Sequence, residues 1–255
     1  MDKIIVANWK MNPATFEEAR ELFEFSVAEA AKYPDMQVVI CPPFVYLEEL
    51  AKLLNAKRST PNTNLGAQDA FWEKSGPFTG EVSTEMLKNF SVSHVLVGHS
   101  DRRYKIGETD EVINKKIKAV LEADIVPVLL VGEKSRGDNR RQILEKQLSL
   151  DFEGLDSGQI SKILVAYEPV WAISANPGAE PDTPENTLEA IKIIKTFLTT
   201  NYQLPTTHFL YGGSVTEKNI ADLLSHSEIS GAVIGGASLR KDEFADILKI
   251  VSEIE

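Results

Sequence analysis

Four residues that could take part in acid–base chemistry stand just after short apolar runs of the chain. They are Asn8 and Lys10 after residues 4–7, His99 after residues 95–97, and Glu168 after residues 163–167. A carboxylate at such a place is desolvated, which suits a general base, and a histidine can serve as general acid or base. A lysine there can hold an anion or stabilise a developing oxyanion. The set predicts proton abstraction next to a carbonyl group.

Each of these residues also has a structural interpretation when it is taken alone. Glu168 could belong to an ion pair, His99 could be a packed histidine, and Lys10 could be an ordinary solvated charge. All of them follow apolar runs that read as strands, and this common position favours the chemical interpretation.

Two glycine pairs predict a phosphate site. Gly212 and Gly213 follow one apolar run and precede Ser214. Gly235 and Gly236 follow the next run. Glycine lets the backbone approach a ligand closely, so that several N–H groups can converge on a phosphate. Either pair alone could be a tight turn, but their occurrence after successive strands favours a phosphorylated substrate.

Eight apolar runs alternate with longer amphipathic segments. The runs cover residues 4–7, 38–41, 64–68, 95–97, 126–131, 163–167, 208–211 and 232–234, and the helical patterns cover 15–27, 45–54, 83–89, 109–121, 139–150, 184–198, 216–224 and 242–251. The runs are too short for helices and do not alternate, which is typical of strands buried on both faces. Eight such units predict an α/β fold of the (β/α)8 type, with eight parallel strands and outer helices, as a single domain over residues 1–255.

An open, doubly wound sheet is the alternative architecture. It usually carries a Gly-x-Gly-x-x-Gly turn after its first strand, whereas residues 8–12 read Asn-Trp-Lys-Met-Asn. In a barrel the active site lies at the C-terminal ends of the strands, which is where all the residues above stand. The usual phosphate site of a barrel follows strands 7 and 8, which is where the glycine pairs stand.

Composition limits the partners, cofactors and location of this chain. With 27 basic and 38 acidic residues its net charge is −11, which argues against nucleic-acid and anionic-membrane partners. The single cysteine, Cys41, excludes an intramolecular disulfide and a multi-cysteine metal site, and no His-x-x-x-His spacing occurs. We therefore expect no metal and no cofactor. No secretion signal and no apolar run of about 18 residues is present, so we expect a cytoplasmic protein.

Seven ordered motifs resemble those of the triosephosphate isomerase family along essentially the whole chain. They are residues 7–12 (ANWKMN), 66–68 (GAQ), 78–83 (FTGEVS), 97–100 (VGHS), 166–173 (AYEPVWAI), 211–215 (YGGSV) and 235–239 (GGASL). The resemblance implies a TIM barrel and a triose-phosphate isomerase (EC 5.3.1.1) of glycolysis and gluconeogenesis. Its substrates would be dihydroxyacetone phosphate and D-glyceraldehyde 3-phosphate, interconverted through an enediolate intermediate without a cofactor.

The resemblance also implies a role for each candidate residue. Glu168 would be the base, His99 the neutral electrophile that polarises the carbonyl, Lys10 the group that stabilises the enediolate, and Asn8 the residue that orients the substrate. The substrate phosphate would bind to backbone N–H groups near Ser174, Ser214, Gly235 and Gly236. A homodimer is implied as well, in which the loop from Gln68 to Ser83 reaches the neighbouring subunit and Thr79 supports that neighbour's Asn8 and Lys10.

The chain departs from the family pattern at several positions. Residues 174–176 read Ser-Ala-Asn in place of Gly-Thr-Gly, and the stretch to Asp182 is longer than usual. Asp101, Leu130 and Asp69 replace a glutamate, a cysteine and an asparagine. Residues 169–183 would form a lid over the active site. We expect this lid to close, its Ser174 N–H to meet the phosphate, and the extra residues to bulge outward near Gly178; the alternative is a lid that stays open.

Two other functions fit part of this pattern. One is another metal-free phosphosugar isomerase or epimerase with a barrel fold, which would lack Asn8 and Lys10 paired with a glutamate after the sixth strand. The other is a non-catalytic binding relative, which should have lost Glu168, His99 or Lys10. The chain retains all of them.

Overall fold

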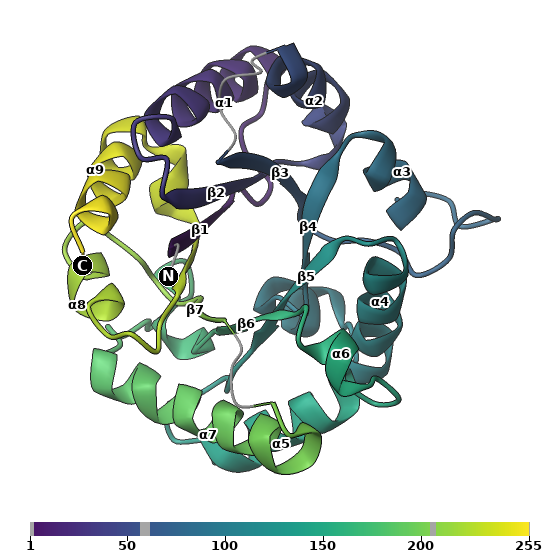
Figure 1. Cartoon of the computed structure of the whole chain (residues 1–255), viewed down its shortest axis with the longest axis vertical. Coiled ribbons are helices and arrows are strands. Elements are labelled where there is room, and N and C mark those ends of the chain that lie inside the picture. The colour runs from purple at the N-terminus through teal and green to yellow at the C-terminus, as the bar shows by residue number, and fades with distance from the viewer. Residues whose placement is uncertain (1–2, 57–61, 205–207, 255) are drawn as a thin grey trace.

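Eight parallel strands close into a barrel in chain order in the computed structural model, and helices surround it (Figure 1). The structure describes residues 3–56, 62–204 and 208–254, so the predicted domain limits at residues 1 and 255 lie outside the described residues. The strands are β1 (Lys3–Asn8), β2 (Met36–Cys41), β3 (Thr63–Ala67), β4 (Val92–Val97), β5 (Val126–Val131), β6 (Leu164–Tyr167), β7 (Phe209–Tyr211) and β8 (Gly231–Ile234). The predicted (β/α)8 fold is confirmed, and the open-sheet alternative is wrong because β1 pairs with β8.

Several helices begin at residues whose side chains cap them. Thr15 caps the first helix through a capping box with Glu18, and Thr183 caps the helix that begins at Pro184. The longer helices are α1 (Phe16–Ala30), α2 (Leu47–Ala56), α3 (Thr84–Asn89), α4 (Asp110–Glu122), α5 (Arg140–Asp151), α7 (Pro184–Tyr202) and α9 (Lys241–Ser252). None of the helices among the described residues is long and apolar enough to cross a membrane.

Four short helical segments were not foreseen, and one helix is shorter than predicted. The unforeseen segments are the π-helix η2 (Asp101–Ile106), α6 (Ser157–Ile160), η3 (Val170–Ala172) and η4 (Gly236–Leu239). The helix α8 covers Ile220–Leu224 only, whereas the pattern predicted residues 216–224. Local hydrogen bonds explain the difference, because Thr216 N–H donates to Asn219 Oδ1 and the Asn219 amide donates to Ser214 O.

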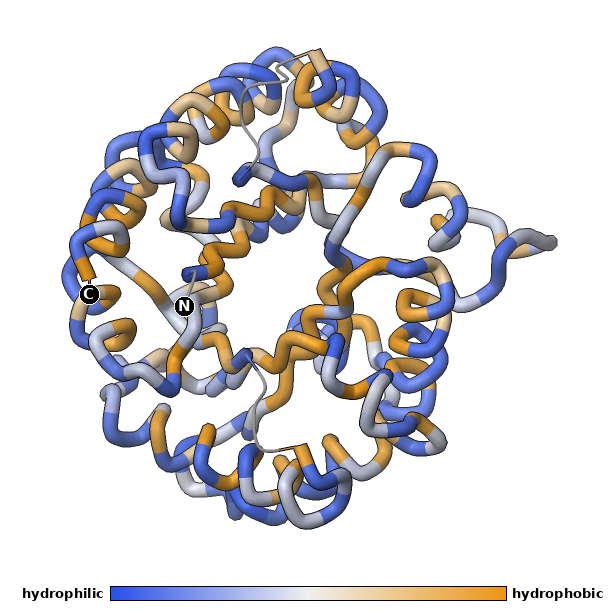
Figure 2. The backbone as a smooth tube through the Cα atoms, in the orientation of Figure 1, coloured by the Kyte–Doolittle hydropathy of each residue, from blue (hydrophilic) through white to orange (hydrophobic). Residues whose placement is uncertain are grey.

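Alternate residues of every strand except β3 enter two separate apolar cores. Ile4 and Val6 of β1 belong to the smaller core inside the barrel, whereas Ile5 and Ala7 belong to the larger core between strands and helices. This two-sided burial explains why the strands read as continuous apolar runs, and Figure 2 shows the hydrophobic colour along them.

The same alternation places two of the candidate residues. Asn8 continues the inward series of Ile4 and Val6, and Glu168 continues that of Leu164 and Ala166. Both side chains therefore project into the barrel at the C-terminal ends of their strands. Their position follows from the two-residue period of a strand, in which successive side chains point to opposite faces.

Candidate active site

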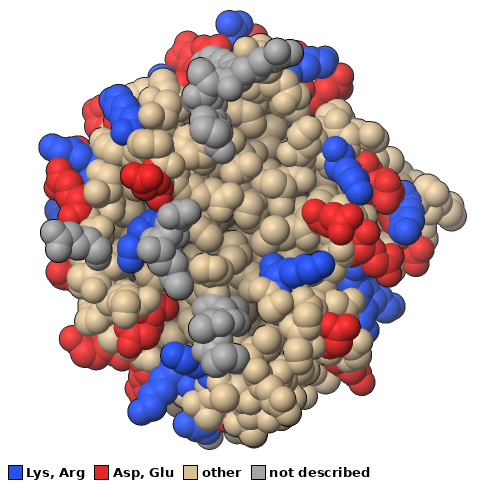
Figure 3. Space-filling view, viewed as in Figure 1, with Lys and Arg blue, Asp and Glu red and all other residues tan. Residues whose placement is uncertain are grey.

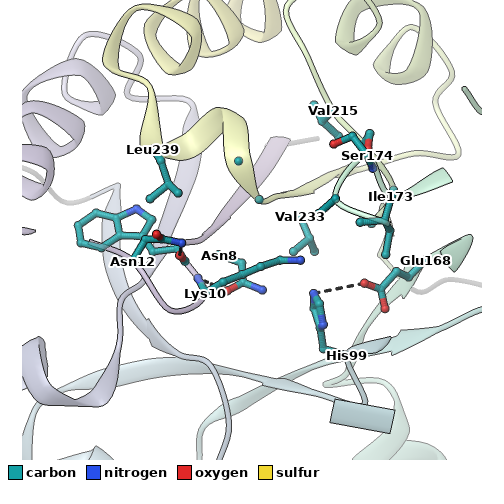
Figure 4. A pocket seen from close by; sticks show the side chains of 17 residues that line it. Asn8, Lys10, Asn12, His99, Glu168, Ile173, Ser174, Val215, Val233 and Leu239 are labelled. Carbon is teal, nitrogen blue, oxygen red and sulfur yellow. Dashed lines mark hydrogen bonds and ion pairs between the residues drawn. The ribbon is translucent and has the colours of Figure 1, made fainter. Parts of the chain in front are cut away.

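All eight candidate site residues line one cavity of about 290 Å³ at the C-terminal end of the barrel (Figure 4). They are Asn8, Lys10, His99, Glu168, Ser174, Ser214, Gly235 and Gly236. In Figure 4 the side chains of Lys10, His99 and Glu168 converge from three different segments of the chain. The cavity is the size of a small metabolite site, and none of the eight residues lies elsewhere.

The Glu168 carboxylate is buried and receives hydrogen bonds from Ser100. Its Oε2 accepts from the Ser100 N–H at 2.8 Å, and its Oε1 accepts from the Ser100 hydroxyl at 3.0 Å. A side chain at Gly132 would not allow this arrangement, because a Cβ there would lie 2.0 Å from the Glu168 carbonyl oxygen. These two hydrogen bonds fix the position of the carboxylate at the end of β6.

His99 is oriented by the backbone that follows it. The Asp101 N–H donates to His99 Nδ1 at 3.0 Å, so this nitrogen acts as an acceptor. The other ring nitrogen, Nε2, then carries the proton of a neutral imidazole, and it lies 3.2 Å from Glu168 Oε1. Gly98 makes this turn possible with a positive φ of 76°. A neutral ring that donates from Nε2 can polarise a carbonyl oxygen.

Lys10 is held in a left-handed backbone conformation, with φ at 53°. Neighbouring side chains stabilise this unusual conformation: Asn8 Oδ1 accepts from the Lys10 N–H at 3.0 Å, and the Gln68 amide donates to the Lys10 carbonyl at 2.7 Å. The role of Asn8 visible here is therefore to shape the turn that carries the lysine.

The Lys10 ammonium lies 3.0 Å from Asp101 Oδ2, while Lys105 lies 2.7 Å from Asp101 Oδ1. Burial opposes ionisation of Asp101, but Lys105 and Lys10 favour its charged form, and its pKa is lowered to about 2. Asp101, which replaces the glutamate usual in the family, thus forms an ion pair with Lys10 although its side chain is shorter.

The phosphate side of the cavity offers unused backbone donors. Within the part of the chain that the structure describes, the N–H groups of Ser214 and Gly235 donate no hydrogen bond. A Cβ added at Gly235 would lie 3.6 Å from Lys10 Cε, so the lysine stem passes directly beside this loop. Free N–H groups next to an ammonium group form a suitable environment for a dianion.

The lid begins at a firmly anchored segment. The Trp171 indole N–H donates to Glu133 Oε1 at 3.0 Å, and the same oxygen accepts from the Tyr167 hydroxyl at 2.7 Å. Arg140 adds an ion pair to this carboxylate at 3.1 Å. Glu133 is 1% exposed and organises the base of the lid, a role that the sequence did not reveal.

The lid ends at a second anchor, Asp182. Its carboxylate accepts from the Thr183 N–H at 2.8 Å, from the Asn186 amide at 2.6 Å and from the Thr187 hydroxyl at 2.9 Å. Burial raises the pKa of Asp182 despite these donors, and burial together with Asp182 raises the pKa of the Tyr211 phenol. The inserted stretch is thus tied to α7 and to the end of β7.

The exposed middle of the lid agrees with the expected bulge. Pro177 and Gly178 are exposed, and Gly178 has a positive φ of 73°. The Ser174 N–H donates to Ser214 Oγ at 2.6 Å, which places it at the phosphate side of the cavity. Whether this N–H contacts a phosphate stays a prediction.

Asp69 belongs to a largely buried group of four charged residues. Lys116, which is 2% exposed, lies 2.6 Å from an Asp69 oxygen and also pairs with Glu108. Arg102 pairs with Asp69 at 2.8 Å and with Glu108 at 2.6 Å. The aspartate that replaces the usual asparagine therefore balances two cations in the interior. These ion pairs support the residues around Arg102, which follow His99 in the chain.

The residues missed by sequence reasoning share one property. Ser100, Glu133 and Asp182 act by accepting or donating hydrogen bonds to a catalytic candidate or to the lid. Ser100 had a weak signal, since it directly follows His99 at the end of β4 in the VGHS motif. Glu133 follows β5 at Gly132 and could have been added by the strand-end rule.

The arrangement contains a buried carboxylate, a neutral imidazole and an ammonium group around one cavity, with backbone donors at its other end. Such a set can remove a proton from carbon, polarise a carbonyl and hold a phosphate. Among the described residues, no group of three or more His, Cys, Asp or Glu side chains is placed to hold a metal ion.

Comparisons with known proteins point in the same direction. A family model described as Triosephosphate isomerase matches residues 3–251. The chain is 40% identical to a triosephosphate isomerase of Dictyoglomus turgidum, with 97% of this chain and 98% of the relative covered, and 40% identical to that of Dictyoglomus thermophilum over the same shares. Among solved structures it is similar to triosephosphate isomerase from Bartonella henselae, with a TM-score of 0.83 and 31% identity over 98% of this chain and 99% of the other.

Proposed function

The chain belongs to the triosephosphate isomerase family, and from this premise we propose how its own residues carry out the family's reaction. The enzyme interconverts dihydroxyacetone phosphate and D-glyceraldehyde 3-phosphate, as part of glycolysis and gluconeogenesis. The observation that carries the residue assignment is the convergence of Glu168, His99 and Lys10 on one cavity. Ser214 and Gly235 line the same cavity, and their N–H groups donate no hydrogen bond within the described part of the chain.

Glu168 is the base in this proposal. It removes a proton from one carbon of the bound triose and returns it to the neighbouring carbon. Its carboxylate must first exchange its hydrogen bonds with Ser100 for the substrate, because both oxygens accept from Ser100. Binding of the substrate completes this rearrangement and places the base next to the carbon that loses its proton.

His99 and Lys10 act on the oxygen atoms of the substrate. The His99 Nε2 proton polarises the carbonyl and moves protons between the two oxygens of the enediolate. The Lys10 ammonium stabilises the negative charge that develops there, and Asn8 holds the turn that presents it. Ser174, Ser214, Gly235 and Gly236 supply the phosphate N–H groups in this scheme.

A coupled assay tests the function directly. With glyceraldehyde 3-phosphate as substrate, the purified enzyme should turn over at the same rate with and without added chelator. Activity abolished by chelator would contradict the metal-free mechanism and favour a metal-dependent epimerase. Tight binding of triose phosphate without turnover would instead favour a binding relative.

We expect the lid to close over a bound substrate analogue. Such a complex should show an ordered lid, with the Ser174 N–H about 3 Å from a phosphate oxygen. Gly178→Pro should lower kcat more than it lowers the free energy of unfolding, because proline cannot adopt the φ of 73° at this exposed position. A lid disordered at saturating ligand, or unchanged kinetics in the variant, would contradict this expectation.

A one-sided distribution of exposed apolar residues supports a homodimer. Among the described residues, the large hydrophobic side chains left exposed all lie in the segments that follow β1 to β4. They are Met11, Val45, Phe78, Met86, Tyr104 and Ile106. The loop that carries Phe78 projects from the barrel beside α3 in Figure 1. Exposed apolar side chains gathered in neighbouring segments of the barrel favour an interface there, and a second copy of the chain is the partner that the family implies.

Sedimentation at micromolar concentration should therefore show a particle near twice 28.3 kDa. Phe78→Asp should shift the enzyme toward monomers and lower its activity, because charge at an apolar interface is costly to bury. Glu189→Lys on α7, which is exposed on another side, serves as the control and should leave the assembly unchanged. A fully active wild-type monomer would contradict both the surface argument and the proposed role of Thr79.

The remaining partners follow from charge and chemistry. We propose a single-domain cytoplasmic enzyme, without nucleic-acid or membrane partners, whose ligand is a small phosphorylated triose. Its net charge of −11 supports this, and Figure 3 shows acidic and basic side chains interspersed around one face rather than a basic field.

A further inference from the structure

One arginine outside the cavity contacts both arms of the lid. Arg136 lies in the connection between β5 and α5, and its guanidinium stands 5.1 Å from the centre of the Trp171 ring on the first arm. The same guanidinium forms an ion pair with Glu180 on the second arm. The Glu180 N–H also donates to the Trp171 carbonyl at 3.1 Å. Arg136 therefore contacts the lid where its two arms meet.

The rest of the lid has little other support. Residues 174–181 lie between the anchored Trp171 and the anchored Asp182. Among the described residues, this arc makes two polar contacts outside the lid, the Ser174 N–H to Ser214 and Glu180 to Arg136. Its other hydrogen bonds stay within the lid, such as those of Asn176 and Glu180 to the carbonyl groups of the first arm. Ordering an exposed arc costs conformational entropy, so each contact that restricts it matters for the closed arrangement.

The connection that carries Arg136 is itself fixed. The Ser135 N–H donates to Asp138 Oδ2 at 2.7 Å, and the Asp138 N–H donates back to the Ser135 carbonyl at 3.0 Å. The Val170 N–H, at the start of the lid, donates to the Glu133 carbonyl of the same connection at 3.1 Å. Arg136 thus contacts the lid from a short loop that is closed on itself.

We propose that Arg136 is a positioning residue for the isomerisation, which holds the two arms of the inserted lid together so that Ser174 reaches the substrate phosphate. This rests on the proposed function, because it needs a phosphorylated substrate under the lid. The cation–π contact and the ion pair bias the arc toward one arrangement before the substrate binds. Arg136 touches no reacting atom, so its contribution passes through the phosphate contact.

Arg136→Gln should raise the KM for glyceraldehyde 3-phosphate about two- to fivefold and leave kcat nearly unchanged, which is the size of effect that an exposed ion pair produces. The substitution should raise KM and not lower kcat, because the lid contacts the phosphate in the ground state and in the transition state alike. Activity on unphosphorylated glyceraldehyde, which offers the lid no phosphate, should not change.

Two further variants test the coupling. Glu180→Gln should give a similar loss, and the double variant should lose less than the product of the two single losses because both remove one ion pair. The exchanged pair, Arg136→Glu with Glu180→Arg, should recover part of the affinity. Arg141→Gln is the matched control, because Arg141 is as exposed as Arg136 (59% against 58%) and pairs with Glu145 away from the lid.

The outcomes separate this inference from the function on which it rests. A wild-type enzyme without activity on triose phosphates would overturn the proposed function. An active wild type with Arg136→Gln indistinguishable from Arg141→Gln would overturn the positioning role alone. Equal losses on phosphorylated and unphosphorylated substrates would also overturn it, since they would mean a structural effect unrelated to the lid.

Discussion

Glu168→Gln is expected to lower kcat by about 10² to 10⁴, the usual contribution of a general base. The amide keeps the shape of the side chain but cannot accept a proton from carbon. It can also keep a hydrogen bond to each donor group of Ser100, since its oxygen can accept from the N–H while its NH₂ donates to the hydroxyl. The fold should therefore survive, and the loss should appear in the chemical step.

Two control measurements on Glu168→Gln distinguish loss of the base from loss of binding or of folding. Binding of a phosphoglycolate-type anion should persist in Glu168→Gln, because the phosphate site is built from other residues. The midpoint of denaturant unfolding should stay close to that of the wild type. A variant that kept more than about half of the wild-type kcat would show that another group is the base.

Lys10→Met is expected to lower kcat by about 10² to 10³, which is the cost of removing one charge-stabilising donor from an active site. The KM should rise too, because the ammonium attracts the anionic substrate before and during the reaction. Methionine keeps most of the length of the stem, and the turn at φ 53° stays supported by Asn8 and Gln68. Steady-state kinetics at low and high salt would measure both effects.

The neighbouring lysine offers a matched control. Lys105 pairs with the same aspartate as Lys10, at 2.7 Å against 3.0 Å, but it does not line the cavity. Lys105→Met should therefore change kcat much less. Unchanged kinetics in Lys10→Met at low salt, or equal losses in both variants, would remove Lys10 from the proposed chemistry.

In the lid, the local departures could be predicted from the sequence, but the contacts with distant residues could not. Its departures from the family, Ser174 to Asn176 and the longer stretch to Asp182, were visible at once, and so was the expected bulge at Gly178. The contact between Arg136 and Glu180 was not, because the two residues lie 44 positions apart. Nothing in either local pattern indicates that their side chains meet.

The hydrogen bonds of Glu168 show the same limit. The strand-end rule selected both Glu168 and the segment containing Ser100. Their distance in the sequence is 68 positions, so the pairing follows only when β4 and β6 are placed in the closed barrel. The buried charges of Asp69 and Lys116, which lie 47 positions apart, likewise depend on the packing of α4 against the barrel.

The sequence by itself determined the order of the eight strands and the longer helices, the helix caps at Thr15 and Thr183, and the side to which Asn8 and Glu168 point. These properties are local, because the period of a strand and the chemistry of a cap are set by neighbouring residues. Only the tertiary structure decided which donors hold Glu168, which lysines share Asp101 and how the lid is anchored at Glu133 and Asp182. Such contacts depend on distances of about 3 Å between segments far apart in the chain, and hydrogen bonds weaken steeply beyond that range, so a periodic pattern carries no information about them.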